Sequence, residues 1–174
     1  MGILAFIIIW TTALTTILLV LAGKMSKIQI FNDGIFVEDF MYPVFIPNDA
    51  IKSIKLGYKL PRILMRTNGY GGLKMWKGFY RIKEGRKRVI LYLEDHNKVP
   101  FIEIQTTKDT YFVNFKNVEQ TMQLYDEMTS AVKPVDESRL IDFKGISPIR
   151  SIIVVVIFTI VIMVPILIVP LLLS

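Results

Sequence analysis

The chain begins and ends in long stretches without a charged side chain, and these two stretches constrain the fold more than any other feature. Residues 2–23 and 151–174 contain no Asp, Glu, Lys or Arg. About 20 helical residues cross a hydrocarbon core of about 30 Å, and a helix that is apolar all round does not suit a water-exposed surface. The sequence therefore predicts two transmembrane α-helices, over residues 1–23 and 151–174.

All charged side chains lie between these stretches, so the net charge of +6 belongs to the middle of the chain. Lys24 and Lys27 follow the first stretch, and Lys144 and Arg150 precede the second. The positive-inside rule then predicts a cytoplasmic middle domain with both termini extracytoplasmic, in a two-span protein of the bacterial inner (cytoplasmic) membrane. A cleavable signal peptide is the alternative for the first stretch, but the stretch lacks a basic n-region and exceeds the usual apolar run of about 7–15 residues.

The first stretch also carries a mildly polar stripe, formed by Thr11, Thr12, Thr15 and Thr16. Such a stripe is a candidate helix-packing surface. The alternative is that each hydroxyl bonds the carbonyl four residues earlier and does nothing more. Neither stretch contains an ionisable side chain, which argues against an ion or proton pathway.

The middle of the chain divides into a domain over residues 24–133 and a linker over 134–150. Its size suits one domain with a core of its own. There are no cysteines, which excludes disulfides, thiolate catalysis and Cys-based metal sites.

The domain is expected to be mainly β. Pairs of apolar, β-branched runs flank short turn sequences, which is the pattern of a hairpin. The paired runs are 27–31 with 35–40, 79–83 with 88–93, and 101–106 with 110–115. Residues 44–46 form a further short strand, 49–56 are either a strand or a helical turn, and the glycine-rich residues 69–78 are expected to be a loop. Short antiparallel strands at this spacing favour a sandwich or barrel.

One amphipathic helix is expected to end the domain. Asn117 is its predicted N-cap, with Gln120 completing a capping box, and Pro134 lies beyond its end. Apolar residues at helical spacing define the face expected to be buried: Val118, Met122, Tyr125, Met128 and Val132.

Four segments resemble the bacterial pleckstrin-homology (PH) domain families. They are Leu60-Pro61-Arg62-Ile63, residues 66–71 (RTNGYG), Gly78-Phe79-Tyr80-Arg81 and residues 89–93 (VILYL). The likeness covers about residues 26–132. It implies a PH-like β-sandwich or partly open barrel with one C-terminal helix, and a tendency to oligomerise. It does not imply phosphoinositide binding.

No catalytic constellation is visible. His96 is the only histidine and lies in a polar turn between Glu94 and Lys98, without further ligands at metal-binding spacing. No serine nucleophile motif occurs. The sequence therefore predicts a protein that is not an enzyme and that has no cofactor or metal.

A run of basic residues is the strongest candidate for a binding surface. Near an anionic membrane each Lys or Arg contributes about 1 kcal/mol, so lipid-surface contact is one interpretation. A solvated hairpin with charge-protected edges and an acidic protein partner are the others. Nucleic acid is disfavoured, because Tyr80 and Tyr92 lie in core-like strands rather than on a stacking platform. The candidate contact residues are Arg62, Arg66, Lys74, Lys77, Arg81, Lys83, Arg86, Lys87 and Arg88.

Three functions fit these observations. The leading hypothesis is a non-enzymatic, membrane-anchored PH-like adaptor or scaffold that forms a homo-oligomer or binds another membrane protein. The second is a module that binds anionic membrane lipids through the basic run. The third is an accessory subunit of a transporter or membrane enzyme complex.

Overall fold

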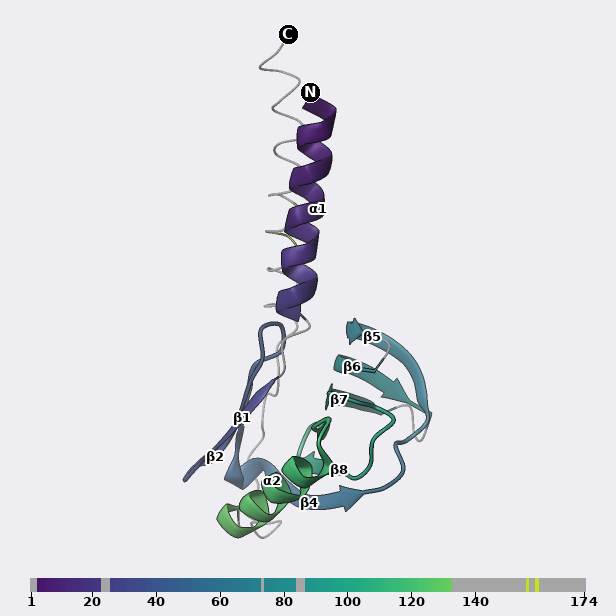
Figure 1. Cartoon of the computed structure of the whole chain (residues 1–174). Coiled ribbons are helices and arrows are strands. Elements are labelled where there is room, and N and C mark those ends of the chain that lie inside the picture. The colour runs from purple at the N-terminus through teal and green to yellow at the C-terminus, as the bar shows by residue number, and fades with distance from the viewer. Residues whose placement is uncertain are drawn as a thin grey trace. The chain divides into compact units, whose positions relative to one another are not determined.

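The computed structural model describes residues 3–22, 26–72, 74–83, 87–132, 156 and 159. The chain divides into two compact units (Figure 1). One consists of Met1–Lys24 with Pro148–Ser174, and the other is Met25–Ser147. The predicted linker and most of the second uncharged stretch lie outside the described residues.

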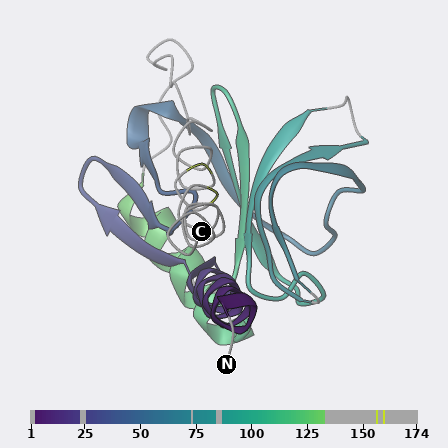
Figure 2. The same ribbon diagram turned by 90° about the horizontal axis from the view of Figure 1, so that it is seen from above.

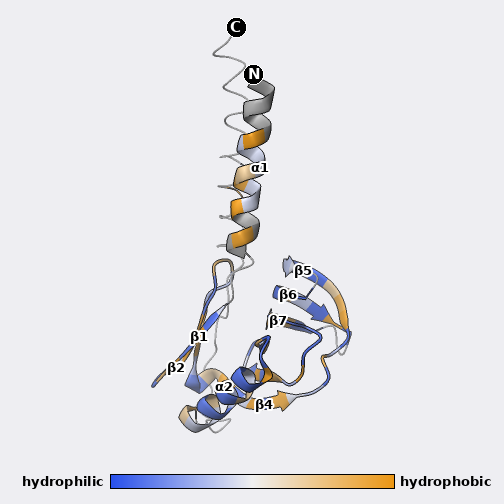
Figure 3. Cartoon of the chain, in the orientation of Figure 1, coloured by the Kyte–Doolittle hydropathy of each residue, from blue (hydrophilic) through white to orange (hydrophobic). Residues whose placement is uncertain are grey.

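The first unit contains helix α1, Ile3–Ala22. Within the part of the chain that the structure describes, no helix combines the length and the apolar character needed to cross a bilayer. The side chains of α1 that the structure describes are those of residues 9–17 and 20, and four of them are threonines. Pale and orange turns alternate along the described part of α1 in Figure 3. The prediction of two transmembrane helices, and with it the two-span inner-membrane location, is wrong.

Two threonines of α1 donate hydrogen bonds to their own helix. The Thr15 hydroxyl donates to the Thr11 carbonyl at 2.7 Å, and the Thr16 hydroxyl donates to the Thr12 carbonyl at 2.8 Å. For these two residues the structure matches the local alternative, in which the hydroxyl satisfies the carbonyl four residues earlier. Helix packing through this stripe stays a prediction.

The second unit opens with a three-stranded antiparallel sheet in the order β1-β2-β3. Its strands are β1 (Lys27–Phe31), β2 (Gly34–Glu38) and β3 (Val44–Pro47). Phe31 pairs with Gly34, so Asn32 and Asp33 form a two-residue turn, as the hairpin pattern predicts. A Cβ on Gly34 would lie 2.4 Å from the Ile46 carbonyl oxygen, which explains why glycine begins β2.

A larger sheet follows, in the order β4-β8-β9-β7-β6-β5. A short 3-10 helix, η1 (Asn48–Ala50), leads into it. Its strands are β4 (Ile51–Gly57), β5 (Ile63–Gly71), β6 (Trp76–Ile82), β7 (Arg88–Leu93), β8 (Phe101–Thr106) and β9 (Thr110–Asn114). The β7–β9 pair is parallel and the other pairs are antiparallel. The sheet curls strongly (Figure 2).

The predicted hairpins over β6–β7 and β8–β9 are confirmed. The expected glycine-rich loop over residues 69–78 is wrong, because Gly69 and Gly71 lie in β5 and Gly78 lies in β6. Glycine suits these strands because the backbones approach closely: a Cβ on Gly69 would lie 2.2 Å from the Lys77 carbonyl oxygen.

Helix α2 (Val118–Ala131) ends the described part of this unit, and its predicted cap is confirmed in part. The Asn117 side chain accepts a hydrogen bond from the Glu119 amide. The predicted face is right in part: Met128 and Val132 are buried in the core and Tyr125 packs against it. Val118 is exposed, and the inward side of α2 also includes Thr121 and Leu124. The mainly β architecture with a terminal helix agrees with the prediction for the middle domain.

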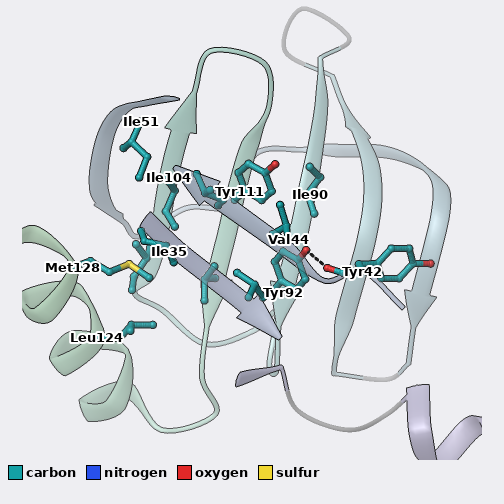
Figure 4. Close-up of a cluster of buried hydrophobic side chains, with 14 of the residues drawn as sticks. Ile35, Tyr42, Val44, Ile51, Ile90, Tyr92, Ile104, Tyr111, Leu124 and Met128 are labelled. Carbon is teal, nitrogen blue, oxygen red and sulfur yellow. Dashed lines mark hydrogen bonds between the residues drawn. The ribbon is translucent and has the colours of Figure 1, made fainter. Parts of the chain in front are cut away.

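The larger sheet has a core on each face. Along β7, Ile90 and Tyr92 belong to one cluster, while Val89, Leu91 and Leu93 belong to the other, as expected where successive side chains point to opposite faces. The first cluster lies between the larger sheet, the three-stranded sheet and α2. Figure 4 shows this cluster, with Leu124 and Met128 entering it from α2 and the Tyr92 hydroxyl donating to the Tyr42 carbonyl.

Candidate functional site

The second face of the larger sheet carries a cavity of about 730 Å³. The cavity is bounded by the segment between β4 and β5 and by strands β6 to β9. Its lining residues are Lys59, Leu60, Pro61, Arg62, Ile82, Lys87, Val89, Glu103, Gln105, Thr110 and Phe112. This size falls within the range of about 300–1,000 Å³ that is usual for ligand sites.

Two predicted contact residues, Arg62 and Lys87, meet at this cavity because the end of β6 holds both backbones. The Lys83 amide donates to the Arg62 carbonyl at 2.9 Å, and the Ile82 amide donates to the Lys87 carbonyl at 3.1 Å. Both side chains are exposed. Their backbones are therefore fixed on either side of one strand end, while their charged ends remain free to meet a ligand.

The floor of the cavity is apolar. Ile82, Val89 and Phe112 line it and are at most 9% exposed. The Phe112 ring packs edge-on against Phe101, with 5.4 Å between ring centroids. Leu60 is half-buried and belongs to the wall. A ligand that entered would meet hydrocarbon below the charged rim.

The charge around the cavity is unbalanced. Lys59, Arg62 and Lys87, called the rim cations below, face one lining carboxylate, that of Glu103. The surrounding sequence extends the imbalance, since residues 50–83 contain no Asp or Glu. The Lys and Arg residues of that stretch are Lys52, Lys55, Lys59, Arg62, Arg66, Lys74, Lys77, Arg81 and Lys83. A concave surface of one sign attracts and concentrates ligands of the opposite sign.

Two other predicted contact residues are neutralised within the fold. Lys77 is 2% exposed, and its ammonium lies 3.0 Å from the Asp39 carboxylate. Arg88 donates from Nε and Nη2 to the two oxygens of Asp109, at 2.9 and 2.7 Å. This bidentate pair raises the pKa of Arg88. These two residues are part of the structure of the domain rather than of its basic surface.

The remaining predicted residues are spread over other surfaces. Arg66 is exposed on β5 and Arg81 on β6. Burial raises the pKa of Tyr80 to about 12, and the positive charge of Arg66 acts in the opposite direction. Lys74 and Lys83 are exposed, and Arg86 lies outside the described residues.

His96 does not lie in a freely solvated turn, as the sequence suggested. It is half-buried, and its ring stacks on Trp76 with 4.1 Å between centroids. Its Nδ1 lies 2.7 Å from the Lys74 carbonyl oxygen. Trp76 also stacks on Tyr80, at 5.9 Å. Among the described residues no group of three or more His, Cys, Asp or Glu is placed to hold a metal ion.

A second hollow, of about 580 Å³, lies between β1 and α2. Its charged lining residues are Lys27 and Glu127, so their charges balance. Glutamines Gln29, Gln120 and Gln123 supply most of its other polar groups. Without an excess of charge or a deep apolar floor, this hollow indicates a ligand class less clearly than the basic-rimmed cavity does.

Sequence reasoning missed Lys59 and the apolar floor. The segment from Lys59 to Arg62 leaves β4, which pairs with β8, and crosses to β5 at the opposite edge of the larger sheet, so the cavity gathers residues that are distant in the sequence. The acid-free stretch over residues 50–83 is a signal that points to this region in the sequence.

Comparisons of the chain with family models, curated proteins and solved structures found no match. The resemblance to bacterial PH domains therefore stays a prediction. The candidate site rests on its own geometry and charge.

Proposed function

We propose that the second unit is a non-enzymatic adaptor domain that binds an acidic, partly apolar segment of a partner protein in the basic-rimmed cavity. The rim cations would bind carboxylates of the segment. An adjacent apolar side chain would lie against Leu60 and the floor residues. This retains the adaptor function expected from the sequence and assigns it to one site.

The observation that carries the proposal is the pairing of rim and floor in one cavity. A merely solvated basic surface needs no apolar cavity beneath it, because its charges serve only to keep the protein soluble. A cavity for a neutral apolar ligand needs no excess of cations at its mouth. The combination fits a ligand that is both anionic and apolar, as an acidic segment with one or two aliphatic or aromatic residues is.

The test is a binding measurement on the full-length chain. A dye-labelled, end-blocked peptide of alternating glutamate and leucine is titrated with the protein, and fluorescence anisotropy reports the dissociation constant. Replacing two rim cations together, Arg62→Gln with Lys87→Gln, is expected to weaken binding at least about tenfold, since each charge-assisted hydrogen bond is worth about 1.5–3 kcal/mol. Both substitutions leave the backbone hydrogen bonds of these residues in place.

The matched control removes two exposed lysines elsewhere, Lys27→Gln with Lys98→Gln, and is expected to leave affinity within about twofold of wild type. Equal losses in the two double variants would show that net charge alone drives binding, and would overturn the proposal. A second outcome would also overturn the proposal: the peptide does not bind, but anionic vesicles capture the protein in a way that depends on Arg62 and Lys87. The site would then be assigned to lipid head groups.

A further inference from the structure

We infer that the acidic segment bound by the cavity is helix α2 of a second copy of this chain. The inference rests on the proposed function, because it names the partner of the same site. It assigns the domain a head-to-tail mode of self-assembly, in which the cavity of one copy meets α2 of the next.

The charge of α2 is opposite to that of the cavity. The helix contains Glu119, Asp126 and Glu127 and no Lys or Arg. This contrasts with the chain as a whole, whose net charge is +6, and with the rim cations. The acidic helix and the basic cavity are therefore complementary surfaces within one sequence. Complementary potentials of this kind steer association and select partners.

The apolar part of the match comes from those residues of the predicted face that the fold leaves at least partly exposed, since Met128 and Val132 of that face are buried. Val118 is 37% exposed and Met122 is half-buried, while Tyr125 is half-buried and packs in part against the first cluster of its own domain. Residues three and four apart are neighbours on a helix surface, so Met122 lies beside both Glu119 and Asp126. We call Val118, Glu119, Met122, Tyr125 and Asp126 the acidic face of α2. It offers the carboxylates and apolar side chains that the rim and floor require.

The contact has to be made between copies. Helix α2 packs through Leu124 and Met128 against the first cluster, while Val89 and Phe112 of the cavity belong to the second. The two clusters lie on opposite faces of the larger sheet, so α2 cannot reach the cavity of its own domain. An interface between two different surfaces leaves one of each unused at the ends, and it extends to a ring or a chain of copies.

The absence of cysteine allows a direct test by cross-linking of full-length chains. One copy carries Lys59→Cys at the rim, and the other carries Ser130→Cys, which is exposed on α2 one turn beyond Asp126. Under mild oxidation the mixed disulfide is expected to form at least about tenfold faster than with a copy carrying Asp33→Cys, in the exposed turn between β1 and β2. Interfaces steered by opposite charges weaken with salt, so added salt should reduce the difference.

Charge reversal makes the test specific. Arg62→Glu with Lys87→Glu in the first copy is expected to reduce the rate to that of the Asp33→Cys control. Adding Glu119→Lys with Asp126→Lys to the second copy should restore the fast cross-linking rate, because the rim is then acidic and the face of α2 is basic. Failure of this rescue, when both reversed proteins unfold at the wild-type denaturant concentration, would overturn the inference.

The outcome also separates this inference from the proposed function. If cross-linking is no faster than in the control but peptide binding persists and depends on Arg62 and Lys87, α2 is rejected as the partner and the adaptor function is retained. Loss of both cross-linking and peptide binding would reject both.

Discussion

The ammonium of Lys77 lies 3.0 Å from Oδ2 of Asp39, and the two side chains are 2% and 3% exposed. The pair joins β6 of the larger sheet to the segment that follows β2. Asp39 also accepts hydrogen bonds from the Ser26 hydroxyl at 2.7 Å and from the amides of Met41 and Tyr42 at 2.9 Å. Both oxygens of the Asp39 carboxylate therefore have hydrogen-bond or ion-pair partners, which a buried charge requires.

Lys77→Met is expected to destabilise the domain by about 3–5 kcal/mol, because it leaves the Asp39 charge buried without its cation. Lys52→Met, at an exposed position of β4, should change the free energy of unfolding by no more than about 0.5 kcal/mol. Urea unfolding measures both. A loss below about 1 kcal/mol for Lys77→Met would contradict the account of this pair.

Gly78→Ala is expected to cost about 1–3 kcal/mol or more, since Gly78 has a φ of +101°, which L-residues adopt only with strain. The added Cβ would also lie 2.6 Å from the Asn68 carbonyl oxygen. Gly71→Ala is the control in the neighbouring strand. Its nearest contact is the end of the Arg66 side chain at 3.0 Å, which can move. Similar losses of unfolding free energy for the two variants would refute the argument.

Glu94 is expected to make stability depend on pH. Burial raises its pKa above the usual 4.5, although the Lys116 amide donates to Oε2 and Lys77 lies nearby. A raised pKa means that the folded state keeps the proton to higher pH than the unfolded state. The contribution of Glu94 to stability is therefore present below pH 4.5 and decreases as the pH rises through the folded pKa.

Glu94→Gln retains an oxygen that can accept from Lys116 and removes the titration. The variant should be more stable than wild type at neutral pH, and the difference should disappear below pH 4.5. Parallel stability curves across this range, measured by urea unfolding at a series of pH values, would show that Glu94 does not titrate as described.

The hairpins were predictable because their information is local. Alternating apolar residues set the inward face of β8, and turn residues such as Asn32 and Asp33 set the register of β1 against β2. The cap at Asn117 is equally local. The features that the sequence did not predict depend on tertiary contacts. The parallel pairing of β7 with β9 and the burial of Lys77 both require knowledge of segments distant in sequence.

The error at α2 has a physical cause. The predicted stripe and the buried side of the helix overlap at Met128 and Val132. Towards the start of the helix they diverge, because the predicted stripe runs to Met122 and Val118, whereas the buried side runs to Leu124 and Thr121. Periodicity cannot decide which stripe faces the sheet. In the structure the Thr121 side faces inward, where its hydroxyl accepts from the Phe115 amide at 3.0 Å. The candidate site was predicted only through Arg62 and Lys87, because the curl of the sheet assembles the rest.

The central claim, that the basic-rimmed cavity binds an acidic and apolar segment, is tested most directly by methyl NMR of the full-length chain during titration with the glutamate–leucine peptide. The account predicts that the methyl signals of Leu60, Ile82 and Val89 shift together and saturate with one affinity. The signal of Ile28, in the hollow between β1 and α2, should remain unchanged. Saturable shifts at Ile28 with none at Ile82 and Val89 would contradict it.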